Sequence, residues 1–151
     1  MSPSLLVGDR IIVDKISYHF ANHRRRDIII FLYPKDESRK FIKRLIGLPG
    51  EKLEIKNQKV FINGRLLPEP YAYHQDVERI NMYPRDNFGP ITIQEGNVFV
   101  LGDNRENSMD SRYWGLLPIE KIEGKVSSIY WSWDKDVESV RWKRIGKRVH
   151  N

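Results

Sequence analysis

The chain has 151 residues, enough for one domain with a sizeable core or for a core with a small lobe. Hydrophobic residues make up 40% and charged residues 30%, which excludes a disordered chain, and the lack of cysteine excludes disulfides, thiolate metal sites and a cysteine nucleophile. The net charge of +6 suits nucleic acid or a membrane surface, although charge alone favours a solvated basic surface.

The first third of the chain predicts short strands joined by polar connections. Strands are expected at 9–15, 27–33 and 41–46, with a basic loop over 17–26 and a charged turn over 35–39. The longest apolar run, 28–33, is far shorter than the roughly 20 residues that span a bilayer. We therefore expect no membrane span in this chain.

After Gly50 the pattern is β throughout, and no segment of helical period exceeds two turns. The Asn63-Gly64 pair is a strong hairpin signal, and the proline-rich stretch 68–90 is expected to be irregular. The tail 140–150 stays open between strand and helix. Strands are expected at 52–56, 59–62, 91–93, 97–101 and 125–133. The predicted fold is mainly β, with antiparallel sheets forming a barrel-like core and a small inserted lobe or flap at about 52–95.

A lysine lies inside the apolar run that begins at Phe41. Because alternate residues of a strand share a face, Lys43 lies between Phe41 and Leu45 on one face, while Arg44 points the other way. Burial between apolar side chains favours the neutral amine, which is a general base. The competing interpretation is a lysine that extends its ammonium to solvent.

The polar segment 102–115 is the second unusual stretch. It contains an Asp110–Arg112 pair that can brace a loop through bidentate hydrogen bonds, and Ser108 lies beside that pair. A serine–lysine dyad needs a serine nucleophile, a neutral lysine and a second hydroxyl that holds the amine. Lys43 and Ser108 can supply the last two, although composition alone favours an ordinary turn rich in Asp, Asn and Ser.

Three ordered segments resemble boxes of bacterial type I signal peptidase. Residues 1–9 (MSPSLLVGD) resemble a box that reads S-M-x-P-T-L-x-x-G-D. Residues 25–31 and 41–51 (RRDIIIF and FIKRLIGLPGE) resemble R-G-D-I-V-V-F and Y-I-K-R-V-V-G-L-P-G-D. Residues 102–115 match G-D-N-R-x-x-S-x-D-S-R-x-W-G in full. The resemblance covers nearly the whole chain.

The resemblance implies a serine endopeptidase that removes signal peptides after Ala-x-Ala-like residues. It assigns the general base to Lys43 and the hydroxyl that orients the lysine to Ser108. It also implies two structural ion pairs and a set of residues that line the substrate pockets. The pairs are Asp110 with Arg112 and Asp103 with Arg44, and the pocket residues are Met1, Leu5, Phe41 and Ile42.

The chain departs from the family pattern at its start. The nucleophilic serine of the family immediately precedes the methionine that aligns with Met1, so it is absent from this sequence, as are the membrane anchor and the upstream oxyanion residues. We therefore expect the chain to be inactive as given, being either a fragment or mis-started product or an inactive relative. Arg26 stands where the family has glycine, and Ser4 stands where it has threonine.

The resemblance implies signal peptides of secreted preproteins and a membrane surface as partners, with the catalytic domain on the extracytoplasmic face of the bacterial membrane. The aromatic residues Tyr130, Trp131, Trp133 and Trp142 suit a membrane interface or a small β core equally well. We expect no metal, no cofactor and no nucleic acid. The alternatives are a binding-only relative that holds extended peptides and, more distantly, a basic nucleic-acid-binding barrel.

Overall fold

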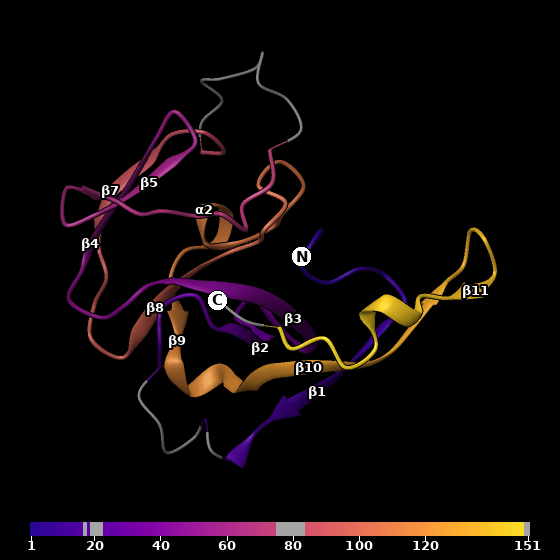
Figure 1. Cartoon of the computed structure of the whole chain (residues 1–151). Coiled ribbons are helices and arrows are strands. Elements are labelled where there is room, and N and C mark those ends of the chain that lie inside the picture. The colour runs from indigo at the N-terminus through magenta and orange to yellow at the C-terminus, as the bar shows by residue number, and fades with distance from the viewer. Residues whose placement is uncertain (17, 19–22, 75–83, 150–151) are drawn as a thin grey trace.

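Two antiparallel sheets form the structure, a computed structural model that describes residues 1–16, 18, 23–74 and 84–149 (Figure 1). The large sheet has the strand order β1-β10-β2-β3-β8-β9, with β11 paired to β10, and the small sheet has the order β6-β5-β4-β7. The strands of the large sheet are β1 (Asp9–Asp14), β2 (Ile28–Tyr33), β3 (Asp36–Gly47), β8 (Asn97–Leu101), β9 (Leu117–Pro118), β10 (Ile122–Asp134) and β11 (Ser139–Val140). Those of the small sheet are β4 (Lys52–Lys56), β5 (Lys59–Ile62), β6 (Arg65–Leu66) and β7 (Phe88–Thr92).

Helical segments are short, as the lack of helical periodicity predicts. They are α2 (Ser111–Trp114), η1 (Ile119–Lys121) and η2 (Trp142–Arg144). Within the described residues, no helix is long and apolar enough to cross a membrane. The mainly β, antiparallel fold is confirmed, but over this part of the chain the large sheet ends at β1 and β9 and does not close into a barrel. The lobe boundaries at about 52–95 stay a prediction.

Most predicted strands are present, and the differences lie at their ends. The charged turn over 35–39 is wrong, because β3 already begins at Asp36, which pairs with Tyr33 of β2. The two ends of this charged segment, Asp36 and Lys40, pair with Tyr33 and Leu32, the register shifts between these pairs, and the side chains of the segment point to solvent. Strand β7 begins at Phe88 rather than 91, and the tail contains both β11 and the helical turn η2. Parts of the predicted loop 17–26 and of the stretch 68–90 lie outside the described residues.

Alternation along the strands divides the core into three clusters. Phe41 and Leu45 pack in one cluster with residues of β2 and β8, whereas Ile42 packs in another with Leu5 and β10. A third cluster joins the end of β3 to the small sheet, through Ile46 and its neighbours in β4, β5 and β8. The predicted assignment of alternate β3 residues to opposite faces is confirmed. The face that carries Phe41 and Leu45 also carries Lys43.

Arg26, the residue that replaces the family glycine, has a left-handed backbone with φ 77°. Its carbonyl accepts a hydrogen bond from Arg44 Nη1 at 2.8 Å, and its own Nη2 donates to the Pro68 carbonyl at 3.0 Å. A side chain in this region strains the backbone, which glycine does not. The turn keeps the conformation that glycine would adopt, at a cost in strain.

We expect Arg26→Gly to relieve this strain. Arg24 is exposed in the same loop and is absent from the positions with positive φ, so Arg24→Gly is the matched control. The free energy of unfolding of Arg26→Gly should exceed that of Arg24→Gly by about 1–2 kcal/mol, measured by urea denaturation. Equal stabilities of the two variants would contradict the assignment of strain to Arg26.

Candidate active site

Lys43 lies in the middle of β3, where it pairs with Ile29 of β2. Its Nζ lies 5.6 Å from the centre of the Phe41 ring. Burial lowers the pKa of the Lys43 amine from its ordinary value; the nearby Asp110 carboxylate opposes this shift, and the Arg112 guanidinium adds to it. Burial of Lys43 therefore shifts the amine toward the neutral form, which the predicted role as a general base requires.

Ser108 lies against the backbone of Gly102, at the end of β8. A Cβ at position 102 would overlap Ser108 Oγ and would lie 3.7 Å from Lys43 Nζ. The hydroxyl and the amine thus converge on the space beside Gly102, which only glycine leaves open. Ser108 Oγ is buried and has no hydrogen-bond partner among the described residues. Its predicted role in orienting the lysine stays a prediction.

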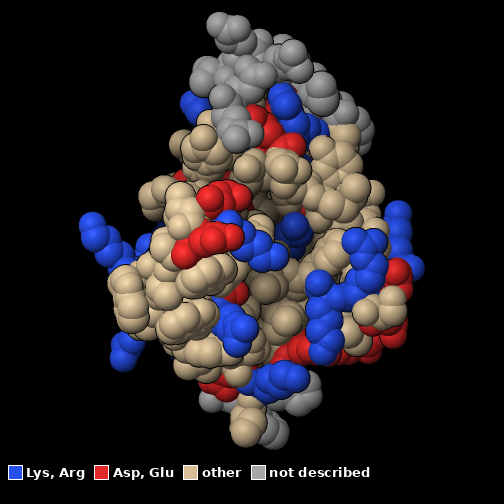
Figure 2. Space-filling view, turned by 90° about the vertical axis from the view of Figure 1, so that its right-hand side faces the viewer, with Lys and Arg blue, Asp and Glu red and all other residues tan. Residues whose placement is uncertain are grey.

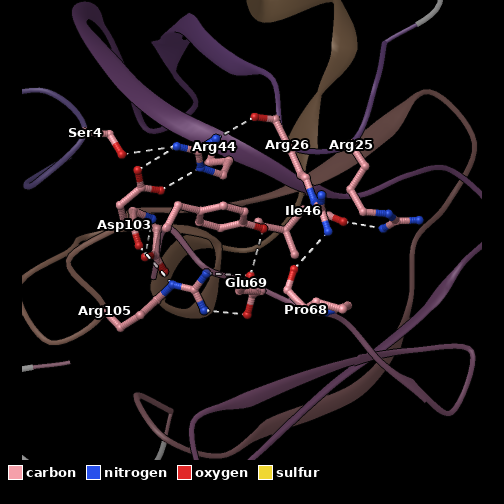
Figure 3. A network of polar contacts seen from close by, with 12 residues as sticks. Ser4, Arg25, Arg26, Arg44, Ile46, Pro68, Glu69, Asp103 and Arg105 are labelled. Carbon is pink, nitrogen blue, oxygen red and sulfur yellow. Dashed lines mark hydrogen bonds and ion pairs between the residues drawn. The ribbon is translucent and has the colours of Figure 1, made fainter. Parts of the chain in front are cut away.

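The predicted pair of Arg44 and Asp103 is present and completely buried. Arg44 donates from Nε and Nη2 to the two Asp103 carboxylate oxygens, each at 2.8 Å. The side chains are 1% and 0% exposed. Arg44 Nη2 also lies 3.3 Å from the Ser4 hydroxyl, so the hydroxyl retained at position 4 contributes to the same cluster (Figure 3). This pair ties β3 to the loop that carries Ser108.

The second predicted pair braces the other end of that loop. Arg112 donates from Nε and Nη2 to Asp110, each at 2.8 Å, and Asp110 also caps α2 by accepting from the Arg112 backbone N–H at 3.3 Å. The second Asp110 oxygen accepts from the Gly102 N–H at 3.1 Å. The carboxylate therefore holds both ends of the 102–112 loop.

A groove of about 380 Å³ opens beside Lys43. All four residues predicted to line the substrate pockets lie on it, namely Met1, Leu5, Phe41 and Ile42. Four more residues line the groove that the sequence did not predict, namely Leu6, Val7, Lys40 and Met109. Met109 is 54% exposed, and its position immediately after Ser108 is a signal from which it could have been predicted. Figure 2 shows a face of the molecule that is hollowed near its centre, with basic side chains in and around the hollow.

Met1 and Lys43 line the same groove. Burial lowers the pKa of the Met1 amino group, and the charge of Lys43 lowers it further. No group of three or more potential ligands for a metal ion occurs in the described part of the chain.

The family model for signal peptidase, peptidase S26, matches residues 1–131. The chain belongs to this family. The matched range includes all three boxes, and with them Lys43 and Ser108.

Curated relatives in the family include a probable signal peptidase I-2 from Synechocystis sp., 38% identical, and a signal peptidase I from Leptolyngbya laminosa, 42% identical. Each alignment covers 87% of this chain but only 59% and 64% of the respective relative. A crystal structure of a signal peptidase I from Enterococcus faecalis V583 is similar with a TM-score of 0.56 at 35% identity, covering 70% of this chain and 97% of that one.

Lys43→Met tests the environment of the lysine in this S26 site. A lysine whose pKa is lowered in the folded state destabilises the fold at pH values below that pKa, and stability returns as the pH rises toward the ordinary value of 10.5. We therefore expect Lys43→Met to be more stable than the parent at neutral pH. The gain should shrink between neutral pH and 10.5, as measured by urea denaturation at several pH values.

Lys40→Met is the matched control, because Lys40 lies on the same strand and pairs with Glu123 at 2.7 Å. Its removal should bring no gain at neutral pH. A pH-independent effect of Lys43→Met would show that the amine is charged and solvated.

Proposed function

We propose that the chain forms the catalytic part of a serine endopeptidase that removes signal peptides from exported preproteins. The observation that carries the proposal is the convergence of Lys43 Nζ and Ser108 Oγ beside Gly102, together with a groove that both Met1 and Lys43 line. In the family box, the residue joined to Met1 is the nucleophilic serine. Such a serine would lie beside a lysine whose pKa burial lowers.

The chemistry follows from these positions. Neutral Lys43 takes the proton of the serine hydroxyl as the oxygen bonds to the scissile carbonyl carbon, and the lysine then protonates the departing amine. Lys43 next takes a proton from water, the hydroxide attacks the acyl-enzyme ester, and the serine oxygen leaves and regains its proton. Ser108 is assigned to hold the Lys43 amine toward the reacting oxygen. No metal or cofactor is needed for these steps.

The apolar groove supports a preference for small residues before the cleaved bond. Its walls come from the segment 1–7 and from β3, and they bring apolar side chains next to the lysine. An extended peptide lying along β3 would place alternate side chains in the groove, which suits an Ala-x-Ala pattern. Leu5 and Ile42, which pack in one core cluster, limit the depth of the groove.

An aromatic patch made of Trp131, Trp133 and Trp142 supports contact with a membrane surface. Trp133 and Trp142 are 39% and 72% exposed. The rings of Trp131 and Trp142 pack edge to face, with their centroids 6.3 Å apart. Two of these rings line a groove of about 460 Å³ together with Arg10 and Lys135. Exposed indoles beside basic groups are suited to an anionic bilayer. We place this face on the extracytoplasmic side of the bacterial membrane.

The peptidase activity can be tested by placing Gly-Gly-Ser before Met1. The two glycines keep the serine from carrying a free amine next to Lys43. We expect cleavage of a preprotein-derived peptide after Ala-x-Ala, detected by mass spectrometry. The rate should be about 10²–10³-fold below that of a full-length relative, because the upstream oxyanion donors are not included.

Two controls complete this experiment. The same chain with Gly-Gly-Ala before Met1 and the 151-residue chain itself should show no turnover. Cleavage by either chain would contradict the assignment of the nucleophile. Peptide binding by all three chains without cleavage by any would favour the binding-only relative.

The contribution of the aromatic patch to membrane binding can be tested separately. We expect the Trp133→Ala/Trp142→Ala double variant to bind vesicles containing phosphatidylglycerol roughly tenfold more weakly, because two indoles are lost from the interface. Sedimentation with vesicles measures the binding. Tyr113→Ala, at an exposed aromatic on α2, is the matched control and should bind as the parent does. Equal binding by all three proteins would rule out this patch as the membrane contact.

A further inference from the structure

The segment 68–73, which follows β6, crosses from the small sheet to the loop that carries Ser108. The Tyr73 N–H donates to the Asp103 carbonyl at 2.8 Å, and the Arg105 N–H donates to the Tyr73 carbonyl at 3.0 Å. These bonds form a short parallel bridge between Tyr73 and Asn104. The segment therefore runs beside the loop as an added strand would. We call residues 68–73 the strap.

The strap holds the loop most firmly through Glu69. Its two carboxylate oxygens accept from Arg105 Nη1 at 3.0 Å and from Arg105 Nη2 at 2.6 Å (Figure 3). The side chains of Arg105 and Glu69 are 4% and 8% exposed. A bidentate pair of this kind fixes the plane of the guanidinium as well as its position. Glu69 thus determines where the third donor of Arg105 points.

The third donor of Arg105, its Nε, reaches the backbone of Gly102 next to Lys43. Arg105 Nε donates to the Gly102 carbonyl at 3.1 Å, and the Gly102 N–H donates to Asp110 at 3.1 Å. Both polar groups of Gly102 are therefore held by charged side chains. Ser108 Oγ and Lys43 Nζ both lie next to the space where a side chain of residue 102 would be. A rotation of the Gly102 peptide would therefore change the backbone against which both side chains pack.

Tyr71 connects the strap to the other buried pair. The guanidinium carbon of Arg44 lies 4.0 Å from the centre of the Tyr71 ring, and the Tyr71 hydroxyl donates to Glu69 at 3.2 Å. The ring covers the guanidinium that holds Asp103, which separates that ion pair from solvent. The strap therefore contacts both arginines that position the loop, Arg44 and Arg105.

We propose that Glu69 is a positioning residue for the Lys43–Ser108 site, acting through Arg105 and the Gly102 carbonyl. The proposal rests on the proposed function and extends it, because it makes the small sheet part of the catalytic apparatus. Glu69 does not line the groove beside Lys43 and has no assigned contact with substrate. Its loss should therefore alter the environment of the lysine rather than the binding of the peptide.

A competing explanation is that Glu69 only neutralises the buried Arg105 charge. Glu69→Gln alone does not separate the two roles, because it leaves a buried guanidinium without its partner. The double variant Glu69→Gln/Arg105→Met removes both charges together, which should restore the melting temperature lost in the single variant. It still lacks the Nε donor to the Gly102 carbonyl. A positioning role that acts through Arg105 predicts that the site stays altered in the double variant, although no charge is then left unpaired.

The measurement is the pKa of Lys43 in the 151-residue chain, followed by NMR of the labelled lysine side chain. Asp110, Arg112 and Asp103 act on this amine, as does the Met1 amino group, and none of them is changed. We expect the pKa to rise toward the ordinary value of 10.5 in both variants, as water reaches the loosened site. Loss of the Glu69 charge by itself would shift the pKa the other way.

Glu54→Gln is the matched control. Glu54 lies in β4 of the small sheet and pairs with Lys56 at 2.9 Å, away from the loop that carries Ser108. This variant should therefore leave the pKa of Lys43 as it is in the parent. An unchanged or lowered pKa of Lys43 in folded Glu69→Gln would overturn the proposal. A parental pKa in the double variant would overturn it as well, and would leave charge compensation as the only role of Glu69. If Glu69→Gln does not fold, the double variant decides.

Kinetics in the chain extended by Gly-Gly-Ser give an independent readout. We expect Glu69→Gln to lower kcat about ten- to a hundredfold with little change in KM, and to move the rising limb of the pH–rate profile to higher pH. A rise in KM with unchanged kcat would contradict a positioning role. If the extended parent shows no turnover, the proposed function fails, while the pKa of Lys43 still tests the role of Glu69.

Discussion

The buried pair of Arg44 and Asp103 is the interaction on which the site depends. It joins the middle of β3 to the loop after β8 and excludes solvent from both groups. Removing one partner of such a pair costs about 3–5 kcal/mol, because a charge is left buried without compensation. Since Lys43 precedes Arg44 on the same strand, the anchoring of Arg44 on one face fixes the position of Lys43 on the other.

The neighbouring basic residues Arg44 and Lys43 differ in how their charge is stabilised, because their surroundings differ. The Arg44 guanidinium stays charged in the interior, because its donors reach Asp103, the Arg26 carbonyl and Ser4. Lys43 has no carboxylate within ion-pair distance among the described residues, and burial lowers its pKa. A strand that presents an arginine inward and a lysine toward a groove therefore separates a structural charge from the proposed general base.

The small sheet contributes to this arrangement from the far side of the loop. Its strap supplies Glu69 and Tyr71, and residues before β7 add a second contact, in which the Arg85 carbonyl accepts from Arg112 Nη1 at 2.8 Å. The two sheets also share an apolar cluster that includes Ile46 and Phe99. Apolar packing brings the sheets together, and the charged contacts determine the exact course of the loop between them.

Local patterns in the sequence determined much of this protein. Alternation along β3 predicted the faces of Phe41, Lys43 and Leu45, and the Asn63-Gly64 turn predicted its hairpin, because side-chain direction and turn geometry depend on adjacent residues. The pairing of Asp110 with Arg112 was predictable too, since the two residues are neighbours in one loop.

Only the tertiary structure decided which distant groups meet. Glu69 and Arg105 lie far apart in the chain and carry no signal of their pairing, because the contact depends on how the small sheet folds back over the loop. The charged segment 36–40 became strand because β2 lies beside it, which its composition does not indicate. The lowered pKa of Lys43 likewise depends on burial by Phe41 and the segment 1–7, and burial is a property of the assembled fold.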